Sequence, residues 1–272
     1  MNDPLLRLKD VALGYNANTL YTGVNLTAGE GELVSLLGAN GAGKSTLLHC
    51  ITGQLAPLAG RVEIAGRDIT GIPKHRLARL VSIVTTGKEM AGGLTVNELV
   101  SLGRQPHTGF FGRLSRRDRE IVVEALAAVG MSEFADRMVA TLSDGERQKV
   151  MIARALAQET PVMALDEPTA FLDVASRLET MQLLARLART EGKAVIVSTH
   201  DVSSALRLSG RLWMIVYNDS RGVGGDCNRE IIDGTPREMI KTDALGKLFR
   251  GRRVQFSPEA MDFIPSGYGK DL

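Results

Sequence analysis

The amino-acid sequence predicts an α/β protein with a mainly parallel sheet core, an N-terminal antiparallel β subdomain and an inserted helical subdomain. Three observations predict this fold class. Short apolar stretches that are typical of buried strands alternate with helical patterns along much of the chain. The first stretch, residues 5–26, alternates as two strands with a turn near residues 16–18 would. Between Thr95 and Ala157 helical periodicity dominates, and no convincing strand pattern appears.

The strands and helices of the core are expected in alternating order. Glu32–Leu37 is an apolar run that predicts a buried strand, and a Gly-rich turn then leads to a helix over Lys44–Cys50. The later strands are expected at Arg61–Ile64, Val81–Val84, Val162–Leu165, Ala194–Ser198 and Leu212–Tyr217, and the later helices at Val174–Thr190 and Val202–Leu208. Strands that alternate with helices favour a parallel sheet that is covered on both faces.

The helical subdomain is expected as an insertion at about residues 95–158, within a single domain of residues 1–250. Its helical patterns cover Val96–Leu102, Ile121–Val129 and Glu146–Leu156. Residues 251–272 form a C-terminal extension, and the glycines and prolines after Arg250 predict loose order there. The stretch Asn218–Asn228 predicts a mobile hairpin loop.

The composition is that of an ordinary soluble globular protein, with 44% hydrophobic and 24% charged residues in 272. The net charge of +2 does not favour nucleic acid as a partner, because polyanion-binding proteins carry clustered basic stretches. The one basic cluster, Arg113–Arg119, is interrupted, and it predicts a solvated helix start. Two cysteines do not make a disulfide framework; Cys50 lies in an apolar helical stretch and is expected to be buried, and Cys227 lies in a Gly-rich loop.

Neither a targeting segment nor a membrane span is predicted. The N-terminus lacks the basic-then-apolar layout of a signal peptide. No apolar run approaches the roughly 20 residues that a transmembrane helix needs. We therefore expect a cytosolic protein, or one that is bound to a membrane only through a partner.

A phosphate-binding pattern follows the first buried strand. The segment Gly38–Ser45 matches the P-loop pattern in full. Its glycines let the backbone wrap around a polyphosphate with the N–H groups pointing inward, and the next helix adds the positive end of its dipole. Lys44 is expected to reach the β- and γ-phosphates, and Ser45 to offer its hydroxyl to Mg²⁺. The nucleotide-binding residues expected here are Gly38, Asn40, Gly41, Ala42, Gly43, Lys44, Ser45 and Thr46.

Two acids follow a later buried strand. Asp166 and Glu167 come directly after Val162–Leu165, at a strand end that would lie beside the P-loop. Asp166 is expected to hold Mg²⁺, directly or through water. Glu167 is expected to polarise the attacking water, since in-line attack on a phosphate needs a positioned water more than a strong base. The P-loop and the acid pair together predict a P-loop NTPase with Mg²⁺ as its cofactor.

One further motif narrows the choice among nucleotide hydrolases. Leu142–Gln148 reads Leu-Ser-Asp-Gly-Glu-Arg-Gln, at the usual kind of spacing before Asp166. It resembles the signature motif of the ATP-binding cassette (ABC) family, which is usually Leu-Ser-Gly-Gly followed by Gln or Glu. The same residues predict a helix N-cap with an acidic first turn. The two interpretations are compatible, because a helix N-terminus is a good place to meet a phosphate.

Three other segments resemble the ABC family in the same order along the chain. Tyr15 is similar to the aromatic residue that stacks on adenine, with a core or turn aromatic as the alternative. Ala170–Asp173 is similar to the loop after the catalytic acid that contacts the partner subunit. His200 is similar to the switch histidine that contacts the γ-phosphate. The resemblance spans roughly residues 5–245.

Two positions depart from the family pattern. The third signature residue is Asp144 instead of Gly, which places a carboxylate near a partner's ATP. We expect Asp144 to cap the helix. The strand Val81–Val84 leads to Thr85 and Thr86, where the family usually has Gln. Because Thr86 stands at the position of this Gln, the resemblance implies that Thr86 belongs to the metal shell. The threonine side chain has a shorter reach than that of Gln.

The resemblance implies a composite ATP site in a head-to-tail homodimer. The permease would be a separate integral membrane protein that docks beside Thr86 and the helical lobe, with a substrate-binding protein taking part indirectly. The implied location is the cytoplasmic face of the bacterial inner membrane, as a peripheral subunit. The implied catalytic residues are Glu167, His200 and Lys44; the signature contacts to ATP are Ser143, Gly145 and Glu146; and the metal ligands are Ser45, Asp166 and Thr86.

A segment of the helical lobe resembles a subgroup of the family. Leu94–His107, together with Gly109–Ser115, is similar to importers of iron chelates: siderophores, haem and cobalamin. Phe110 and Phe111 would either pack on the permease or fill the core of the lobe, and the sequence leaves both open. The site that recognises the transported compound would lie on other polypeptides.

Two other functions are alternatives to an importer ATPase. One is a soluble cassette ATPase, for instance of iron–sulfur cluster assembly, and copurification with a membrane protein separates it from a transporter subunit. The other is a regulatory module that binds ATP without hydrolysing it. Asp144 and the missing Gln favour this second alternative, whereas Glu167 and His200 argue against it. A tandem translation-factor cassette does not fit, because there is only one P-loop.

Overall fold

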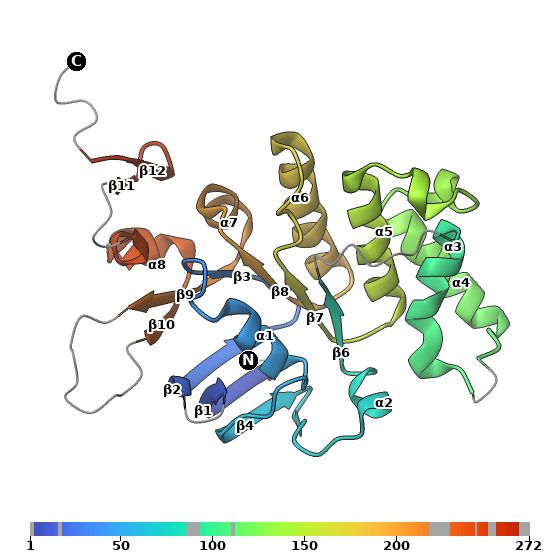
Figure 1. Ribbon diagram of the computed structural model, residues 1–272, viewed down its shortest axis with the longest axis horizontal. Helices are drawn as coiled ribbons and strands as arrows, with labels where there is room; N and C mark the ends of the chain where they lie inside the picture. The colour runs from blue at the N-terminus through green and yellow to red at the C-terminus, as the bar shows by residue number, and fades with distance from the viewer. Residues whose placement is uncertain are drawn as a thin grey trace.

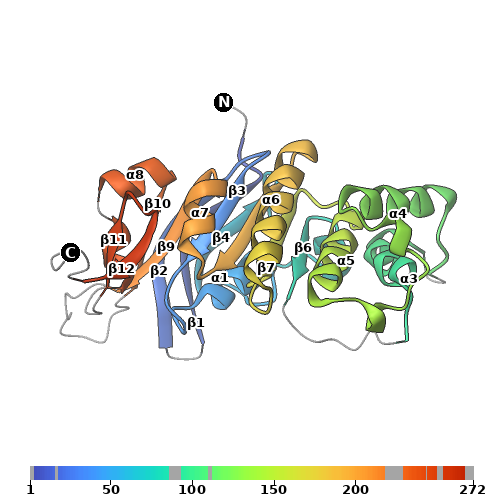
Figure 2. The ribbon, with the colours of Figure 1, turned by 90° about the horizontal axis from the view of Figure 1, so that it is seen from above.

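The computed structural model describes residues 3–15, 18–85, 93–109, 112–217, 229–242, 244–249 and 254–266. An N-terminal antiparallel sheet, a central sheet and a helical lobe lie next to one another (Figures 1 and 2). Several predictions fall outside the described residues, namely those for Thr86, Phe110, Phe111, Cys227 and the loop Asn218–Asn228.

The N-terminal sheet is antiparallel, as the alternating sequence predicts. Its strands are ordered β2-β1-β4-β5. On β1, Leu6 and Leu8 are buried while Arg7 and Lys9 between and after them are partly exposed, which is the alternation of a sheet with one face on a core. The strands are β1 (Leu6–Tyr15), β2 (Asn18–Ala28), β4 (Ala59–Ile64) and β5 (Arg67–Asp68).

The central sheet is mainly parallel and has the order β10-β9-β3-β8-β7-β6. Every neighbouring pair from β9 to β6 is parallel, and β10 pairs antiparallel with β9 at the edge. Each strand coincides closely with a predicted one, except for β10, which has no predicted counterpart. The strands are β3 (Leu33–Leu37), β6 (Val81–Val84), β7 (Val162–Asp166), β8 (Ala194–Thr199), β9 (Arg211–Tyr217) and β10 (Arg229–Gly234).

Successive residues of the central strands face opposite cores. In β7, Met163 and Leu165 pack with α6, whereas Val162 and Ala164 pack with α1 and the N-terminal sheet. Figure 1 shows α6 and α7 on one side of the central sheet and α1 on the other. Both faces are therefore covered, which explains the uninterrupted apolar runs in the sequence. The covering helices are α1 (Lys44–Ile51), α6 (Val174–Thr190) and α7 (Val202–Leu208), and α2 (Lys74–Leu77) precedes β6.

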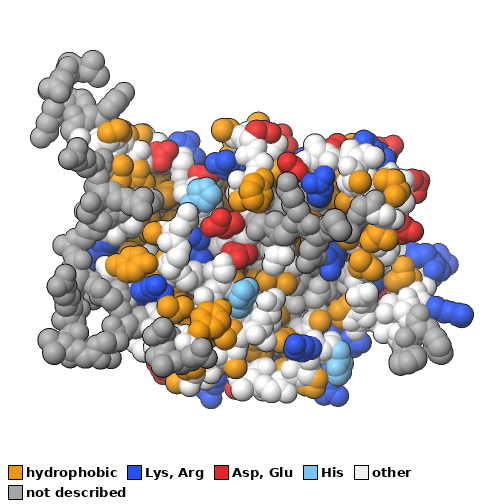
Figure 3. Space-filling model, in the orientation of Figure 1, with side chains coloured by type: hydrophobic (Ala, Val, Ile, Leu, Met, Phe, Trp, Pro, Cys, Tyr) orange, Lys and Arg blue, Asp and Glu red, His pale blue; other side chains and the backbone are white. Residues whose placement is uncertain are grey.

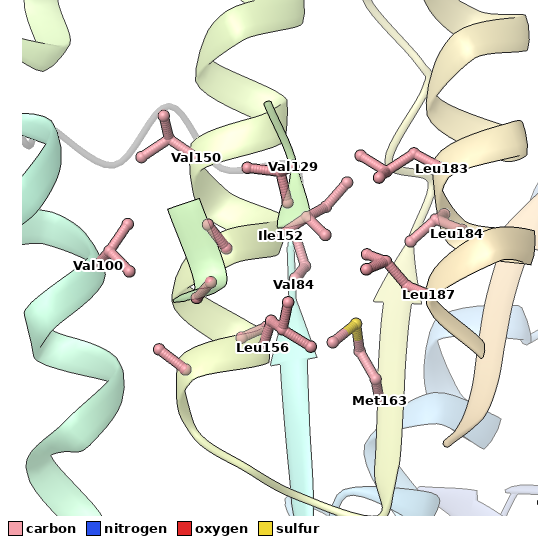
Figure 4. Close-up of a cluster of buried hydrophobic side chains, with 14 of the residues drawn as sticks. Val84, Val100, Val129, Val150, Ile152, Leu156, Met163, Leu183, Leu184 and Leu187 are labelled. Atoms are coloured by element: carbon pink, nitrogen blue, oxygen red, sulfur yellow. The ribbon is translucent and has the colours of Figure 1, made fainter. Parts of the chain in front are cut away.

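The inserted lobe is helical, as predicted, and it shares a core with the sheet. Figure 4 shows Leu156 of α5, Met163 of β7 and Leu187 of α6 close together in this core. Helix α4 begins with a capping box of Ser115 and Asp118, so that the basic cluster does open a helix. The elements are α3 (Val96–Ser101), η1 (Leu102–His107), α4 (Arg116–Ala128), η2 (Ser132–Phe134), η3 (Val139–Thr141) and α5 (Asp144–Ala157).

The C-terminal region contains ordered elements that the sequence did not predict. The expectation of loose order after Arg250 is wrong for β11 and β12, which pair antiparallel. Phe256 and Phe263 meet edge to face with ring centres 5.5 Å apart, and both pack on the core around α7 and η4. The division of the chain at residue 250 stays a prediction. The elements are α8 (Pro236–Lys241), η4 (Ala244–Phe249), β11 (Val254–Ser257) and β12 (Asp262–Pro265).

The mixed surface charge and the burial of Cys50 both agree with what the sequence predicts. Lys and Arg side chains are interspersed with Asp and Glu on the face drawn in Figure 3. Cys50 is fully buried in α1, and burial raises the pKa of its thiol to about 12, so that it is a small apolar side chain as expected. Over the part of the chain that the structure describes, no helix is both long and apolar enough to cross a bilayer.

Candidate active site

Three of the predicted segments meet at one edge of the central sheet. The P-loop follows β3, Asp166 ends β7, and His200 directly follows β8. Strand β8 lies between β3 and β7. Because the strands are parallel, their carboxyl ends lie at the same edge, and segments that are far apart in the sequence come together there.

The P-loop needs two of its glycines for backbone reasons. Gly41 and Gly43 have left-handed φ values of 76° and 103°, which residues with a side chain rarely adopt. At Gly43, an added Cβ would also overlap the hydroxyl of Tyr21. Gly43 directly precedes α1, and no side chain caps that helix. The first N–H groups of α1 are therefore available to an anion that enters the loop.

Lys44 lies at the centre of the site. Its side chain is only 6% exposed, and its Nζ lies 3.5 Å from Glu167 Oε1. The ammonium also donates to the Gly38 carbonyl at 2.9 Å. These contacts hold the charge of Lys44 over the P-loop, where it can meet phosphate oxygens.

The acid pair is fixed from the neighbouring strand. Ser198 Oγ donates to Asp166 Oδ1 at 2.5 Å, and it accepts a hydrogen bond from the Glu167 N–H at 2.8 Å. Glu167 has a left-handed φ of 46°, an uncommon conformation for a residue with a side chain. Its Oε2 lies 4.0 Å from His200 Nδ1. The carboxylate of Glu167 thus stands between Lys44 and His200.

The P-loop, Glu167 and His200 share one cavity of about 360 Å³. The side chain of His200 is about half exposed, so it can reach a ligand. Val202 of α7 and Leu248 of η4 add an apolar wall that the sequence did not predict. The lining residues are Leu37, Gly38, Ala39, Asn40, Glu167, His200, Val202 and Leu248.

The donor atoms at this edge fit Mg²⁺. Asp166 supplies a carboxylate and Ser45 a hydroxyl, both of them oxygen donors of the kind that Mg²⁺ prefers. Among the described residues, no group of three or more His, Cys, Asp and Glu side chains could hold a metal by itself. Mg²⁺ is usually bound through one or two carboxylates together with substrate phosphates, so this sparse donor set is ordinary for that ion.

Comparison with known proteins accounts for the arrangement. A family model described as ABC transporter matches residues 21–170. This chain belongs to the ABC transporter family. The iron(3+)-hydroxamate import ATP-binding protein FhuC of Bacillus subtilis is 37% identical to it over 245 residues, which cover 90% of this chain and 87% of FhuC. The ferric enterobactin transport ATP-binding protein FepC of Escherichia coli is 33% identical over 244 residues, covering 90% of this chain and 86% of FepC.

A solved structure shows the same fold. MJ1267, an ATP-binding cassette of an ABC transporter in its ADP conformation, matches with a TM-score of 0.77 at 21% identity. The match covers 92% of this chain and 100% of that one. ATP-binding subunits of ABC transporters hydrolyse ATP, so this chain is an ABC-type ATPase.

The segment that resembles the ABC signature opens α5 in the helical lobe. The Glu146 N–H donates to Ser143 Oγ at 3.3 Å, and the Ser143 N–H donates to the Glu146 carboxylate at 2.8 Å. The predicted helix cap is confirmed, and the hydrogen bonds from Ser143 lower the pKa of Glu146. Neither of these residues nor Gly145 is among the described residues that line the P-loop cavity of this chain.

Asp144 does not cap α5, so that expectation is wrong. Ser143 occupies the cap position, and Asp144 is the first residue of the helix. Arg147 Nη1 donates to Asp144 Oδ1 at 2.9 Å, and its Nη2 donates to the Leu142 carbonyl at 3.0 Å. The carboxylate that departs from the ABC pattern is therefore paired with a guanidinium of its own helix.

Two tyrosines of the N-terminal sheet differ in their relation to the P-loop. Tyr15 ends β1 with its side chain 49% exposed, and it is not among the described residues that line the cavity. Its stacking on adenine stays a prediction. Tyr21 is buried and donates a hydrogen bond to the Ala42 carbonyl of the P-loop. Strict alternation back from Val24 and Leu26 would place Tyr21 on the outer face of β2. An irregularity in the pairing of β1 with β2 turns it inward, so the sequence does not connect Tyr21 with Gly43.

The segment that resembles iron-chelate importers is built into the helical lobe. Arg104 is 4% exposed, and it donates to Asp118 Oδ1 at 2.9 Å and to the Ala157 carbonyl at 2.6 Å. His107 Nε2 lies at hydrogen-bond distance, 2.9 Å, from the Gln158 carbonyl. These contacts tie η1 to the end of α5. Arg104 and His107 thus have structural partners within the lobe.

Proposed function

We propose that this chain powers an importer of an iron chelate, such as a ferric siderophore, through separate permease subunits. The observation that carries the proposal is the position of Glu167, which contacts Lys44 and His200 and lines one cavity with the P-loop and His200. The functions of the relatives FhuC and FepC, iron(3+)-hydroxamate import and ferric enterobactin transport, support the cargo class. Haem and cobalamin are the alternative cargoes that the sequence suggests.

Glu167 is the residue that would hold the attacking water. Its carboxylate lies between Lys44 and His200, close to the P-loop. Lys44 would neutralise the β- and γ-phosphates, and His200 would contact the γ-phosphate. Mg²⁺, held by Asp166 and Ser45, would supply further charge neutralisation on the phosphate oxygens. Each residue then acts on positioning or on charge, which are the main needs of phosphoryl transfer.

A second copy of the chain would complete the ATP site. Ser143 and Gly145 lie at the N-terminus of α5, a place that favours phosphate, and the cavity beside the P-loop of the same chain does not include them. Phe171 and Val174 are 71% and 81% exposed, which suits burial against a partner. Light scattering of the Glu167→Gln variant should show a dimer with MgATP and a monomer without it.

A groove of about 510 Å³ is a suitable seat for a cytoplasmic helix of the permease. The groove is lined by residues of α2, β6 and α5, so it lies at the boundary between the sheet core and the helical lobe. Lys74, Ile83 and Arg154 contribute to its lining, which combines apolar and positively charged groups. A chain held in this way would be a peripheral subunit at the cytoplasmic face of the inner membrane.

An ATPase assay of the wild type and of Glu167→Gln tests the hydrolytic function. We expect the variant to bind ATP and to release phosphate about 10²- to 10⁴-fold more slowly, the usual contribution of a positioned acid or base. Equal rates in the two proteins would support the non-hydrolysing regulatory module. Copurification with a membrane protein would exclude the soluble cassette.

Uptake of labelled ferric siderophore, haem and cobalamin in a deletion strain tests the cargo. The proposal expects siderophore uptake to depend on this chain and to be restored by the wild-type gene but not by Glu167→Gln. If none of the three compounds required the chain, the importer assignment would be lost.

A further inference from the structure

Ser198 of β8 lies beside the end of β7, where Asp166 and Glu167 follow one another, and it is completely buried. It is the second-last residue of β8 and pairs in register with Asp166 of β7. Its hydroxyl forms hydrogen bonds with Asp166, which lies beside it in β7, and with Glu167, the residue that follows β7. No other described hydroxyl bonds both acids.

The hydroxyl of Ser198 uses its donor on one acid and an acceptor on the other. It donates to Asp166 Oδ1 at 2.5 Å, and it accepts from the Glu167 N–H at 2.8 Å. A serine hydroxyl carries one donor and two acceptor lone pairs, so both bonds form at once. The bond to Asp166 is charge-assisted, which makes it short and strong. It occupies Oδ1 and leaves Oδ2 as the oxygen that can face a metal.

The bond to Glu167 fixes an unusual piece of backbone. Glu167 has a φ of 46°, a conformation that persists in a residue with a side chain only when its surroundings hold it. Ser198 holds its N–H, and the Ala170 N–H donates to its carbonyl at 3.1 Å. The turn that aims the Glu167 carboxylate at the cavity is therefore held at both ends.

We propose that Ser198 is a positioning residue for ATP hydrolysis, which orients the metal-binding oxygen of Asp166 and the water-holding carboxylate of Glu167 together. The proposal rests on the proposed hydrolytic function. Ser198 does not line the cavity, so it acts through the two acids and not on the nucleotide.

Ser35 provides the matched control, because its buried hydroxyl forms a hydrogen bond that does not lead to the site. Ser35 of β3 is also fully buried, and its Oγ lies 2.7 Å from Ser209 Oγ. Removing the Ser35 hydroxyl breaks a buried hydrogen bond in the neighbouring strand without touching either acid. Ser35→Ala and Ser198→Ala thus differ mainly in whether the lost bond leads to the site.

The test compares full-length wild type, Ser198→Ala, Ser198→Thr and Ser35→Ala. The first readout needs no turnover: electron paramagnetic resonance measures the half-saturating Mn²⁺ concentration of the ADP-bound protein. We expect Ser198→Ala to raise this concentration about 10- to 100-fold, the usual effect of removing a partner that orients a metal ligand. Ser35→Ala should bind Mn²⁺ as the wild type does. Ser198→Thr keeps the hydroxyl and should restore most of the affinity.

The second readout separates positioning from nucleotide binding. Ser198→Ala should lower kcat about 10- to 100-fold with little change in KM for ATP, because the P-loop contacts are intact. Wild-type Mn²⁺ affinity and kcat in Ser198→Ala, or equal losses in Ser35→Ala, would overturn the proposal. If the wild type itself released no phosphate, the hydrolytic function would fail, while the Mn²⁺ titration would still decide the role of Ser198.

Discussion

Lys44 Nζ lies 3.5 Å from Glu167 Oε1, so the P-loop lysine and the acid after β7 are direct neighbours. The lysine is the first residue of α1, directly after the loop that follows β3, and the acid comes from the loop after β7, with β8 between the two strands. Only the parallel arrangement of these three strands brings the two side chains together. The pair therefore links the backbone topology to the chemistry at the phosphate.

Replacing Lys44 with alanine should weaken ATP binding. A hydrogen bond to a charged group contributes about 1.5–3 kcal/mol, so we expect the affinity to fall by about 10- to 100-fold. Isothermal titration calorimetry with ATP measures the change. Lys9→Ala is the control, because Lys9 forms a 3.0 Å ion pair with Glu63 in the N-terminal sheet, away from the cavity. Unchanged affinity and turnover in Lys44→Ala would remove the basis of the nucleotide site.

Replacing Arg147 with alanine should leave the carboxylate of Asp144, in the signature segment, without its positively charged partner. Arg147 is 2.9 Å from Asp144, and the pair is largely exposed, so its loss should change stability by no more than about 1 kcal/mol. The free carboxylate should instead repel the ATP of a partner subunit. Arg147→Ala in the Glu167→Gln background should therefore form fewer ATP-dependent dimers by light scattering.

A second substitution separates charge from the other contacts of Arg147. Asp144→Gly, added to Arg147→Ala, should recover dimer formation because it removes the repelling carboxylate. If the double variant were as defective as Arg147→Ala, the hydrogen bond from Arg147 to the Leu142 carbonyl would be the important contact.

Asp118 should make the stability of the helical lobe sensitive to acid. Hydrogen bonds from Ser115 and then the nearby Arg104 guanidinium lower the pKa of Asp118 to about 2. An unfolded chain has an aspartate pKa of about 3.9, so the ionised form stabilises the fold above about pH 4, and this stabilisation is lost as the pH falls from about 4 towards 2.

Urea unfolding of the wild type and Asp118→Asn at several pH values checks this. At pH 7 the variant should be less stable by about 1–3 kcal/mol, because a charged hydrogen-bonding partner of the buried Arg104 is lost. The difference between the two proteins should shrink towards low pH. A difference that did not depend on pH would show that ionisation of Asp118 is not the cause.

Filling the groove between α2 and α5 should uncouple the chain from its permease. Ala78 lines this groove, and a long charged side chain there would occupy the space that we propose for a permease helix. If the permease binds this groove as proposed, Ala78→Arg should lose copurification with the permease and lose uptake, while its melting temperature shows that it is folded. Leu58→Arg is the control, since Leu58 is already 52% exposed and does not line the groove.

The parts of the fold that depend on local pattern could be predicted from the sequence. Strand β6 and helices α6 and α7 begin and end at the predicted residues, because their apolar periodicity is strong and their ends are marked by turns. Strands β10, β11 and β12 could not be predicted in this way. Their residues are mostly half-buried or exposed, so they lack a clear apolar alternation.

Interactions that depend on the register between strands could not be predicted from the sequence either. The sequence marks Asp166 and Glu167 as candidates, but it does not show which residue of the next strand lies opposite them. Ser198 becomes visible only through the pairing of β7 with β8. The same holds for Asp144, because a sequence motif does not indicate that Arg147 will take its carboxylate. The roles of Ser45, Thr46 and Thr86 stay predictions.

The alternation of β7 between two cores limits how this protein can change in length. Inserting or deleting one residue there would turn Met163 towards α1 and Ala164 towards α6, which would overfill one core and hollow the other. The same event would shift Asp166 by about 3.3 Å along the strand, away from Ser198. Insertions and deletions can therefore be tolerated in the connecting segments of this chain, but not in β7, which positions Asp166.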